Sequence, residues 1–179
     1  TRGAANRPLS KLVAAREGRM VEVSSSIRID APPEKVYELW SNYENFRHFM
    51  SNVSEVRDLG NRRSHWVVKG PGGVEFKFNA VLTEKSSPHR LAWRSEPGAE
   101  IEQAGSVDFH PSRGGTRVTV HMTYMPPAGV AGHGLAWVLG SDPESKMDED
   151  LARMKAFIER GVVPAAAARE ESSHGRFLH

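Results

Sequence analysis

The sequence pattern that most constrains the fold is an apolar stripe near the carboxyl end, formed by Met147, Leu151, Met154 and Ile158. Spacings of four, three and four residues put these side chains on one face of a helix. The helix is predicted to run from about Pro143 to Arg160, because proline is favoured at the first helical position. Its opposite face is charged and holds Lys146, Asp148, Glu149, Arg153, Lys155 and Glu159. Such a helix needs a second apolar surface to cover.

That surface is supplied by segments between about residues 21 and 124 in which apolar and polar residues alternate. Alternation with a period of two is typical of a strand with one buried face. It predicts seven strands, at residues 21–30, 53–59, 63–69, 74–83, 90–95, 100–110 and 116–124. The short connections between them are rich in glycine and proline and predict antiparallel pairing. Two short helices are predicted after the first strand, at 33–40 and 43–50.

One strand, two short helices, six strands and one long helix make an α+β order. We expect a curved antiparallel sheet wrapped around the long C-terminal helix, in one domain at residues 20–161. Residues 1–19 are predicted to be a basic arm or linker, and residues 162–179 a disordered tail. A strongly twisted sheet around a single helix tends to leave an opening at one end, which is the physical case for a pocket.

Charge is concentrated at the start of the chain. The formal net charge is +2, and residues 1–19 hold five basic residues and one acidic residue, a net of +4, so the remainder carries −2. A folded domain with that charge lacks the excess of basic residues that binds the phosphates of nucleic acid, so no nucleic-acid partner is predicted. The basic arm leaves open a weak contact with a membrane surface.

Several classes of site are excluded or disfavoured by composition. Cysteine is absent, which excludes disulfides, thiolate zinc sites and cysteine nucleophiles. The eight histidines include no helical i, i+4 pair, and His110 and His121 fall on the outward sides of their strands. We therefore predict no metal site and no cofactor. No run approaches the roughly 20 apolar residues of a membrane helix. A cytoplasmic protein is predicted, with membrane tethering as the alternative if the chain is a fragment.

Local motifs across residues 20–160 resemble a known family. The two longest are APPEKVYELW at 31–40 and YENFRHFM at 43–50, and shorter ones fall at 64–66, 69–71, 92–95, 105–107 and 126–127. Together they resemble the polyketide cyclase/dehydrase or coenzyme-Q-binding branch of the START/Bet v 1-like (SRPBCC) superfamily. The resemblance implies the helix-grip fold and a deep, mostly apolar cavity. It does not imply one activity, because members bind lipids, quinones, polyketides or hormones and only a minority are catalysts.

The candidate ligand-binding residues are the inward-facing strand positions and the helix stripe. They are Trp66, Val68, Phe76, Phe78, Trp93, Ser95, Gln103, Phe109, Tyr124, Met147, Leu151 and Met154. Trp40 and Phe46 are expected to pack the short helices instead. Neighbours on a strand face opposite ways, so His65 would point inward only if Trp66 pointed outward, and apolar Trp66 is the better inward residue.

No carboxylate is expected inside the cavity, because the polar face of the sheet takes Glu75, Glu100, Glu102 and Asp108. Glutamine, serine and tyrosine can orient a ligand but offer no obvious proton shuttle. This favours binding or carriage of a hydrophobic small molecule, such as a lipid, a quinone or a polyketide-like compound, and no catalytic residue is assigned. Two alternatives stay open. One is a cyclase/dehydratase in which Gln103, Tyr124 or His65 polarises a carbonyl or relays a proton. The other is an interaction module whose cavity is filled by its own side chains.

Overall fold

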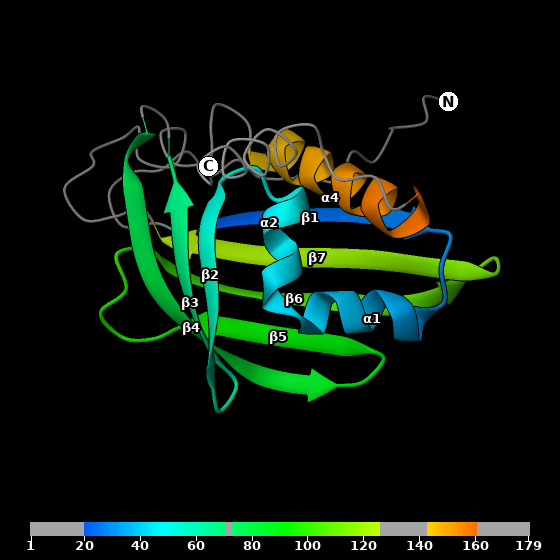
Figure 1. Ribbon diagram of the computed structural model, residues 1–179, viewed down its shortest axis with the longest axis horizontal. Helices are drawn as coiled ribbons and strands as arrows, with labels where there is room; N and C mark the ends of the chain where they lie inside the picture. Colours follow the sequence, from blue (N-terminus) through cyan, green and yellow to red (C-terminus); the bar gives the residue numbers. More distant parts are fainter. Residues whose placement is uncertain (1–19, 71–72, 126–142, 161–179) are drawn as a thin grey trace, which may run out of the picture.

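A seven-stranded antiparallel sheet, in the order β1-β7-β6-β5-β4-β3-β2, forms the body of the protein (Figure 1). The computed structural model describes residues 20–70, 73–125 and 143–160. The strands are β1 (Val21–Ile29), β2 (Val53–Gly60), β3 (Arg63–Lys69), β4 (Glu75–Ser86), β5 (Arg90–Ser95), β6 (Glu102–Ser112) and β7 (Gly115–Met125). All seven expected strands are present, and the α+β prediction is confirmed.

Tight turns set the pairing of neighbouring strands. Between β2 and β3, Gly60, Asn61 and Arg62 have φ angles of 75°, 52° and 62°. Between β6 and β7, Arg113 and Gly114 have φ angles of 49° and 78°. This left-handed backbone conformation is easiest for glycine and tolerable for asparagine. The chain therefore reverses within a few residues, and each of these pairs is antiparallel.

Two strands extend two or three residues past their predicted ends. β4 continues to Ser86, which pairs with Arg90 of β5, and β6 continues to Ser112, which pairs with Gly115 of β7. Beyond the apolar core the side chains are polar, so alternation no longer reports the strand. The backbone pairing continues nevertheless, because it does not depend on side-chain polarity.

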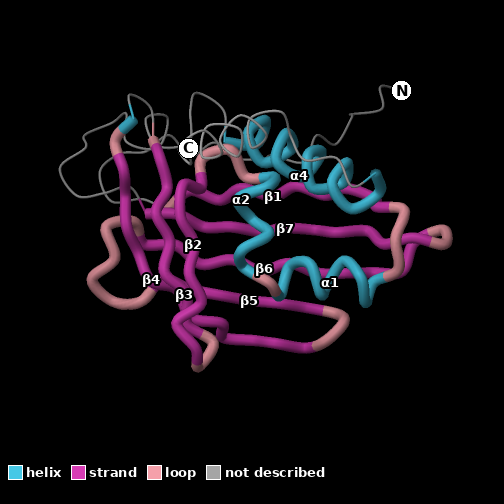
Figure 2. Tube along the Cα trace, in the orientation of Figure 1, coloured by secondary structure: helices cyan, strands magenta, loops and turns pink. Residues whose placement is uncertain are grey.

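The helices lie together on one side of the strands (Figure 2). They are α1 (Pro33–Ser41), the 3₁₀ turn η1 (Tyr43–Asn45), α2 (Phe46–Phe49) and α4 (Pro143–Arg160), which has the predicted limits. α4 packs along β1 and against α2, while α1 packs on β6 and β7. This is the helix-grip arrangement. Within it, α4 lies along the edge strand β1 and not across the centre of the sheet.

The inner face beneath α1 and α4 is solidly packed. Phe109 and Met154 are fully buried. The ring of Phe109 meets those of Tyr37 and Trp40 edge-on, at centroid distances of 5.6 Å and 6.1 Å. The indole N–H of Trp40 donates to the sulfur of Met154 at 2.9 Å, which ties α1 to α4. This end of the domain is therefore core rather than cavity.

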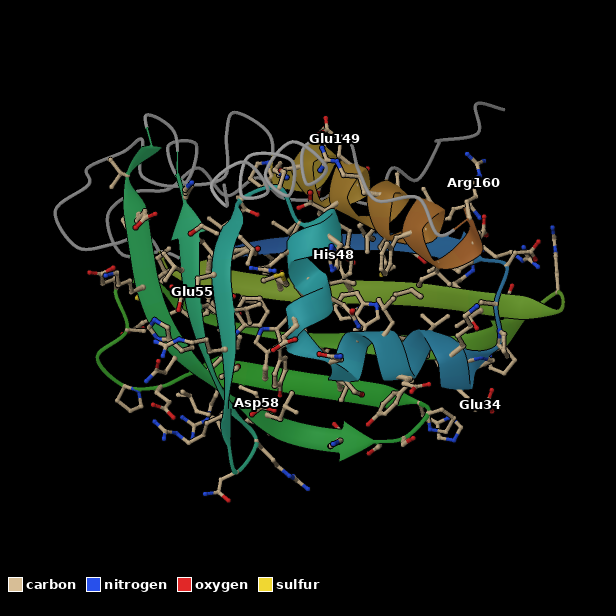
Figure 3. All side chains as sticks on the ribbon, viewed as in Figure 1. Glu34, His48, Glu55, Asp58, Glu149 and Arg160 are labelled. Carbon is tan, nitrogen blue, oxygen red and sulfur yellow. The ribbon has the colours of Figure 1, made fainter. Side chains whose placement is uncertain are left out.

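Charged side chains lie around the outside of this framework (Figure 3). Glu34 on α1, Glu55 and Asp58 on β2, and Glu149 on α4 are all exposed. The predicted arm at 1–19 and tail at 162–179 lie outside the described residues, and the proposed domain limits stay a prediction.

Candidate ligand cavity

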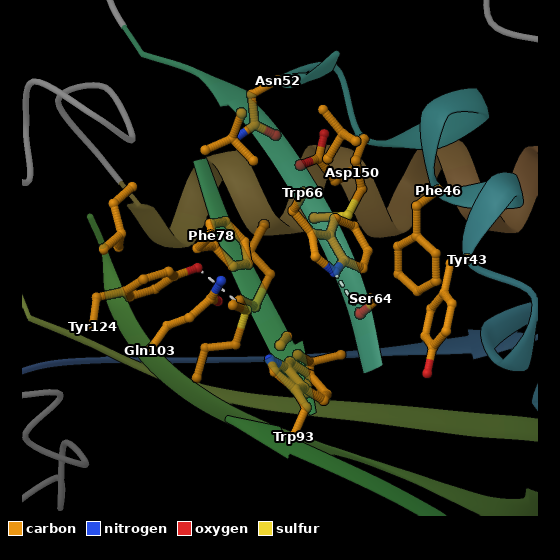
Figure 4. A pocket seen from close by; sticks show the side chains of 18 of the residues that line it. Tyr43, Phe46, Asn52, Ser64, Trp66, Phe78, Trp93, Gln103, Tyr124 and Asp150 are labelled. Carbon is orange, nitrogen blue, oxygen red and sulfur yellow. Dashed lines mark hydrogen bonds between the residues drawn. The ribbon is translucent and has the colours of Figure 1, made fainter. Parts of the chain in front are cut away.

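A cavity lies where the helices leave the inner face of the sheet uncovered (Figure 4). Its lining comes from β2 to β7, from the short helices and from the first half of α4. The volume of the cavity is about 170 Å³. That is room for about six waters, at about 30 Å³ each in the liquid, or for one small organic molecule.

Aromatic rings make most of one wall. Trp66 on β3 stacks on Phe78 of β4, with ring planes 3° apart and centroids 6.2 Å apart. Phe46 of α2 meets the same indole edge-on at 5.4 Å. The Trp66 N–H donates to the hydroxyl of buried Ser64 at 2.8 Å, so the indole carries no unpaired polar atom into the cavity. The result is a flat apolar surface held in one orientation.

Eight of the twelve residues proposed from sequence line this cavity: Trp66, Val68, Phe78, Trp93, Gln103, Tyr124, Met147 and Leu151. They come from five strands and α4, so the fold brings together positions far apart in sequence. Contact with a ligand remains a prediction for all of them.

The other four do not line it. Phe109 and Met154 belong to the solid core described above. Ser95 accepts the main-chain N–H of Gln103 at 3.0 Å, and this hydrogen bond turns it to its neighbouring strand. Phe76 packs at the edge of a second apolar cluster around Val56 and Ile101. Alternation identified the correct face for these residues, but the cavity occupies only part of that face.

His65 points away from the cavity, as its neighbour Trp66 points in. A ring nitrogen, Nδ1, lies 2.7 Å from the side-chain oxygen of Asn79 on β4. The proton-relay role considered for His65 therefore has no geometric basis. Trp40 and Phe46, which we expected only to pack the short helices, both line the cavity as well.

One carboxylate does face the cavity, contrary to the sequence-based expectation. Asp150 on α4 is 6% exposed and lies in the lining. Lys146 and Arg153 donate to its Oδ1 at 2.7 Å and 2.6 Å. Burial raises the pKa of the Asp150 carboxyl, and the hydrogen bond and charge of Lys146, then the charge of Arg153, act against that rise. The sequence did contain a signal for this burial. Position 150 is three residues after Met147 and four before Met154, which places it on the apolar face of the helix.

Further polar side chains in the lining include Tyr124, Gln103 and Asn52. The Tyr124 hydroxyl donates to the sulfur of Met122 at 3.2 Å, and burial raises its pKa. The amide of Gln103 lies beside it (Figure 4). The side-chain oxygen of Asn52 is buried and has no hydrogen-bond partner within the described part of the chain. A cavity with apolar walls and a few polar groups is the usual form of a small-molecule site.

The family is decided by comparison with known proteins. The family model described as polyketide cyclase / dehydrase and lipid transport matches residues 29–152. The chain belongs to this family. An uncharacterised 17.2 kDa protein of Streptomyces lincolnensis is 34% identical over 143 residues, which cover 78% of this chain and 91% of the relative.

The family match confirms the resemblance that the motifs indicated, and solved structures share the fold. The Deinococcus radiodurans protein DR_A0006 is 32% identical with a TM-score of 0.65, over 79% of this chain and 99% of that one. The di-domain ARO/CYC protein BexL of the BE-7585A biosynthetic pathway is 16% identical with a TM-score of 0.57, over 78% of this chain and 50% of that one. The likeness to BexL is one of fold.

Within residues 20–70, 73–125 and 143–160, histidine, aspartate and glutamate side chains form no group of three that could hold a metal ion. No helix among these residues is long and apolar enough to cross a membrane.

Proposed function

We propose that the protein binds or carries a hydrophobic small molecule, of lipid, quinone or polyketide-like character, in this cavity. The observation that carries the proposal is the open space between Trp66, Phe78 and Trp93 on the sheet and Met147 and Leu151 on α4. Each 100 Å² of apolar ligand surface withdrawn from water contributes roughly 2.5 kcal/mol, before the cost of association. Methionine side chains also adapt to ligands of irregular outline.

Native mass spectrometry of gently purified protein is the first test. We expect a retained apolar molecule, or binding of an added probe such as naphthalene, measured by calorimetry. Failure of every apolar probe to bind the folded protein would overturn the proposal.

A plugged variant locates the binding. Met147→Trp should fill the cavity from the α4 side and abolish naphthalene binding, while circular dichroism shows a folded protein. The matched control is Glu149→Trp, which adds the same ring to the exposed side of the same helix. If Met147→Trp binds as tightly as the unmodified protein, the ligand is held elsewhere.

A second candidate is a cyclase or dehydratase acting on such a ligand. The burial of Asp150 in the lining favours it, since a carboxyl group with a raised pKa can serve as a general acid or base. The test compares the molecules retained by the unmodified protein and by Asp150→Asn. Dehydration at this site predicts that the variant retains a molecule heavier by one water. Identical molecules in both would exclude dehydration by Asp150.

The interaction-module alternative required the protein's own side chains to fill the cavity. Trp66, Trp93, Met147 and Leu151 instead border open volume. Nothing in the described residues supports that alternative over ligand binding.

A further inference from the structure

The polar groups of the cavity are not scattered evenly. Asp150 on α4 and Asn52, next to the start of β2, lie at the same end of the lining (Figure 4). They are linked through Ser51. Its hydroxyl accepts from Lys146, which also donates to Asp150, each at 2.7 Å. The aromatic side chains, and the polar pair Gln103 and Tyr124, lie in other parts of the lining, so Asp150 and Asn52 form a polar group of their own.

Asn52 presents an acceptor that no described residue satisfies. Its side-chain oxygen is buried and lacks a hydrogen-bond partner among these residues. Its main-chain carbonyl accepts from the N–H of Lys69 at 2.7 Å, so the backbone from which the side chain projects is fixed to β3. Buried acceptors in proteins are nearly always paired, so an unpaired one beside a cavity calls for a donor from the cavity side.

The Asp150 carboxylate offers further acceptor capacity at the same place. Lys146 and Arg153 both donate to one oxygen, Oδ1. An ionised carboxylate can accept about four hydrogen bonds. Capacity for another donor therefore remains.

The cations at this end are already engaged. Lys146 lies 2.7 Å from both Ser51 and Asp150, and Arg153 contacts Glu149 at 3.4 Å as well as Asp150. Two positive charges thus face two negative charges, and the group is close to neutral. An anionic ligand would meet the buried charge of Asp150 without gaining a free cation.

We propose that Asp150 and Asn52 form a subsite for a hydrogen-bond donor, so that the ligand is an apolar ring compound bearing a neutral hydroxyl group rather than a carboxylate. This inference rests on the proposed function and specifies the class of molecule that the cavity takes. The ring body lies against Trp66 and Phe78, and the hydroxyl points to the pair of acceptors.

Four naphthalene compounds of nearly equal size test the inference by calorimetry. They are naphthalene, naphthol, methoxynaphthalene and naphthoate, substituted at the same ring position. Naphthol donates a hydrogen bond, methoxynaphthalene can only accept one, and naphthoate is anionic. We expect naphthol to bind roughly tenfold more tightly than methoxynaphthalene, as one hydrogen bond to a charged or buried acceptor would give. Naphthoate should bind more weakly than naphthol.

Two variants test whether Asn52 and Asp150 cause the preference for naphthol. Asn52→Leu should reduce the preference for naphthol over methoxynaphthalene, and Asp150→Asn should admit naphthoate by removing the negative charge and freeing Lys146 and Arg153. Glu149→Gln is the matched control, because it removes the same charge from the exposed side of α4 and should leave the order of affinities unchanged.

The outcomes separate this inference from the proposed function. If naphthalene binds but naphthol and methoxynaphthalene bind equally, the subsite is wrong and the apolar cavity stands. If Asn52→Leu prefers naphthol over methoxynaphthalene as strongly as the unmodified protein does, Asn52 is not part of the subsite and the proposal is wrong. If none of the four binds, the proposed function fails and this inference fails with it. The comparison in the unmodified protein remains decisive even if a variant does not fold.

Discussion

Gly105 on β6 lies opposite Trp93 on β5, and the indole occupies the space that a larger side chain at position 105 would need. A Cβ atom at that position would lie 2.8 Å from Cε2 of the indole and 2.9 Å from the main-chain oxygen of His121. Both distances are well inside van der Waals contact. The glycine therefore lets a cavity-lining ring lie close against the sheet.

Gly105→Ala should consequently alter both stability and the cavity. The backbone of β7 is fixed by pairing with β6, so Trp93 has to move toward the cavity. We expect a loss of about 1–3 kcal/mol in the free energy of unfolding, as for other overpacked sites. Naphthalene should also bind more weakly. Urea unfolding and calorimetry measure the two effects.

The matched variant for this prediction is Gly105→Ala combined with Trp93→Phe. The smaller ring should relieve the contact and restore part of the lost stability. If Gly105→Ala alone leaves both stability and affinity unchanged, the close contact of the indole with β6 does not shape the cavity.

The hydrogen bond between Trp66 and Ser64 should stabilise the stacked wall of the cavity. Ser64 is 3% exposed and accepts the indole N–H at 2.8 Å. Ser64→Ala leaves that N–H without its partner, and we expect the free energy of unfolding to fall by about 1–3 kcal/mol.

A double-mutant cycle with Trp66→Phe isolates this contribution from the loss of ring area. Once the indole N–H is gone, Ser64→Ala should cost less than it does in the unmodified protein. Equal costs in the two backgrounds, measured by urea unfolding, would show that the hydrogen bond contributes nothing to stability.

Sequence patterns predicted the strands most accurately where turn chemistry and apolar alternation coincide. β3 begins after positive-φ residues and ends before Gly70, and its limits match the prediction. The outward ends of β4 and β6 were missed, because their polar side chains carry no alternation signal while the backbone continues to pair. Alternation also placed Trp66 inward and His65 outward correctly.

Phe109 and Asp150 lie where the sequence pattern did not predict them, each for a physical reason. Alternation reports which face a strand residue takes, but not whether a helix or open space lies above it. Phe109 therefore looked like a cavity residue although Tyr37 and Trp40 cover it. Asp150 was overlooked because only the carboxylates of the strands were considered, although its position in the helical repeat matched the apolar stripe. The neighbouring Lys146 and Arg153 make its burial tolerable.

Glu159 should make stability depend on pH in the acid range. It accepts from the main-chain N–H of Asp30 and from Lys155, each at 2.6 Å, which ties the end of α4 to the end of β1. The hydrogen bond from Lys155, then that from Asp30, lowers the pKa of the Glu159 carboxyl in the folded state. A lowered pKa means that the stabilisation is present above the unfolded-state value and is lost as the pH falls through the folded-state value.

Glu159→Gln tests this dependence. The variant should be less stable than the unmodified protein near neutral pH, by on the order of 1 kcal/mol. The difference should be constant near neutral pH and should shrink as the pH falls below the ordinary glutamate pKa of about 4.3 and through the lower folded-state value. Urea unfolding at several pH values measures it, and a difference that does not vary with pH would contradict the assignment.

All three tyrosines of the chain should resist ionisation in the folded protein. Burial raises the pKa of Tyr37, Tyr43 and Tyr124 above the ordinary value of 10.0. A raised phenol pKa means that stability is intact below the unfolded-state value and declines as the pH rises through the folded-state value. At about pH 10, therefore, phenolate absorbance should be well below half of the value reached in denaturant at strongly alkaline pH, since free tyrosine is half ionised there. Tyr124→Phe should remove the most resistant group and simplify the end of the titration. Half-ionised tyrosines in the folded protein at that pH would show that these rings, including the two in the cavity lining, Tyr43 and Tyr124, are open to water.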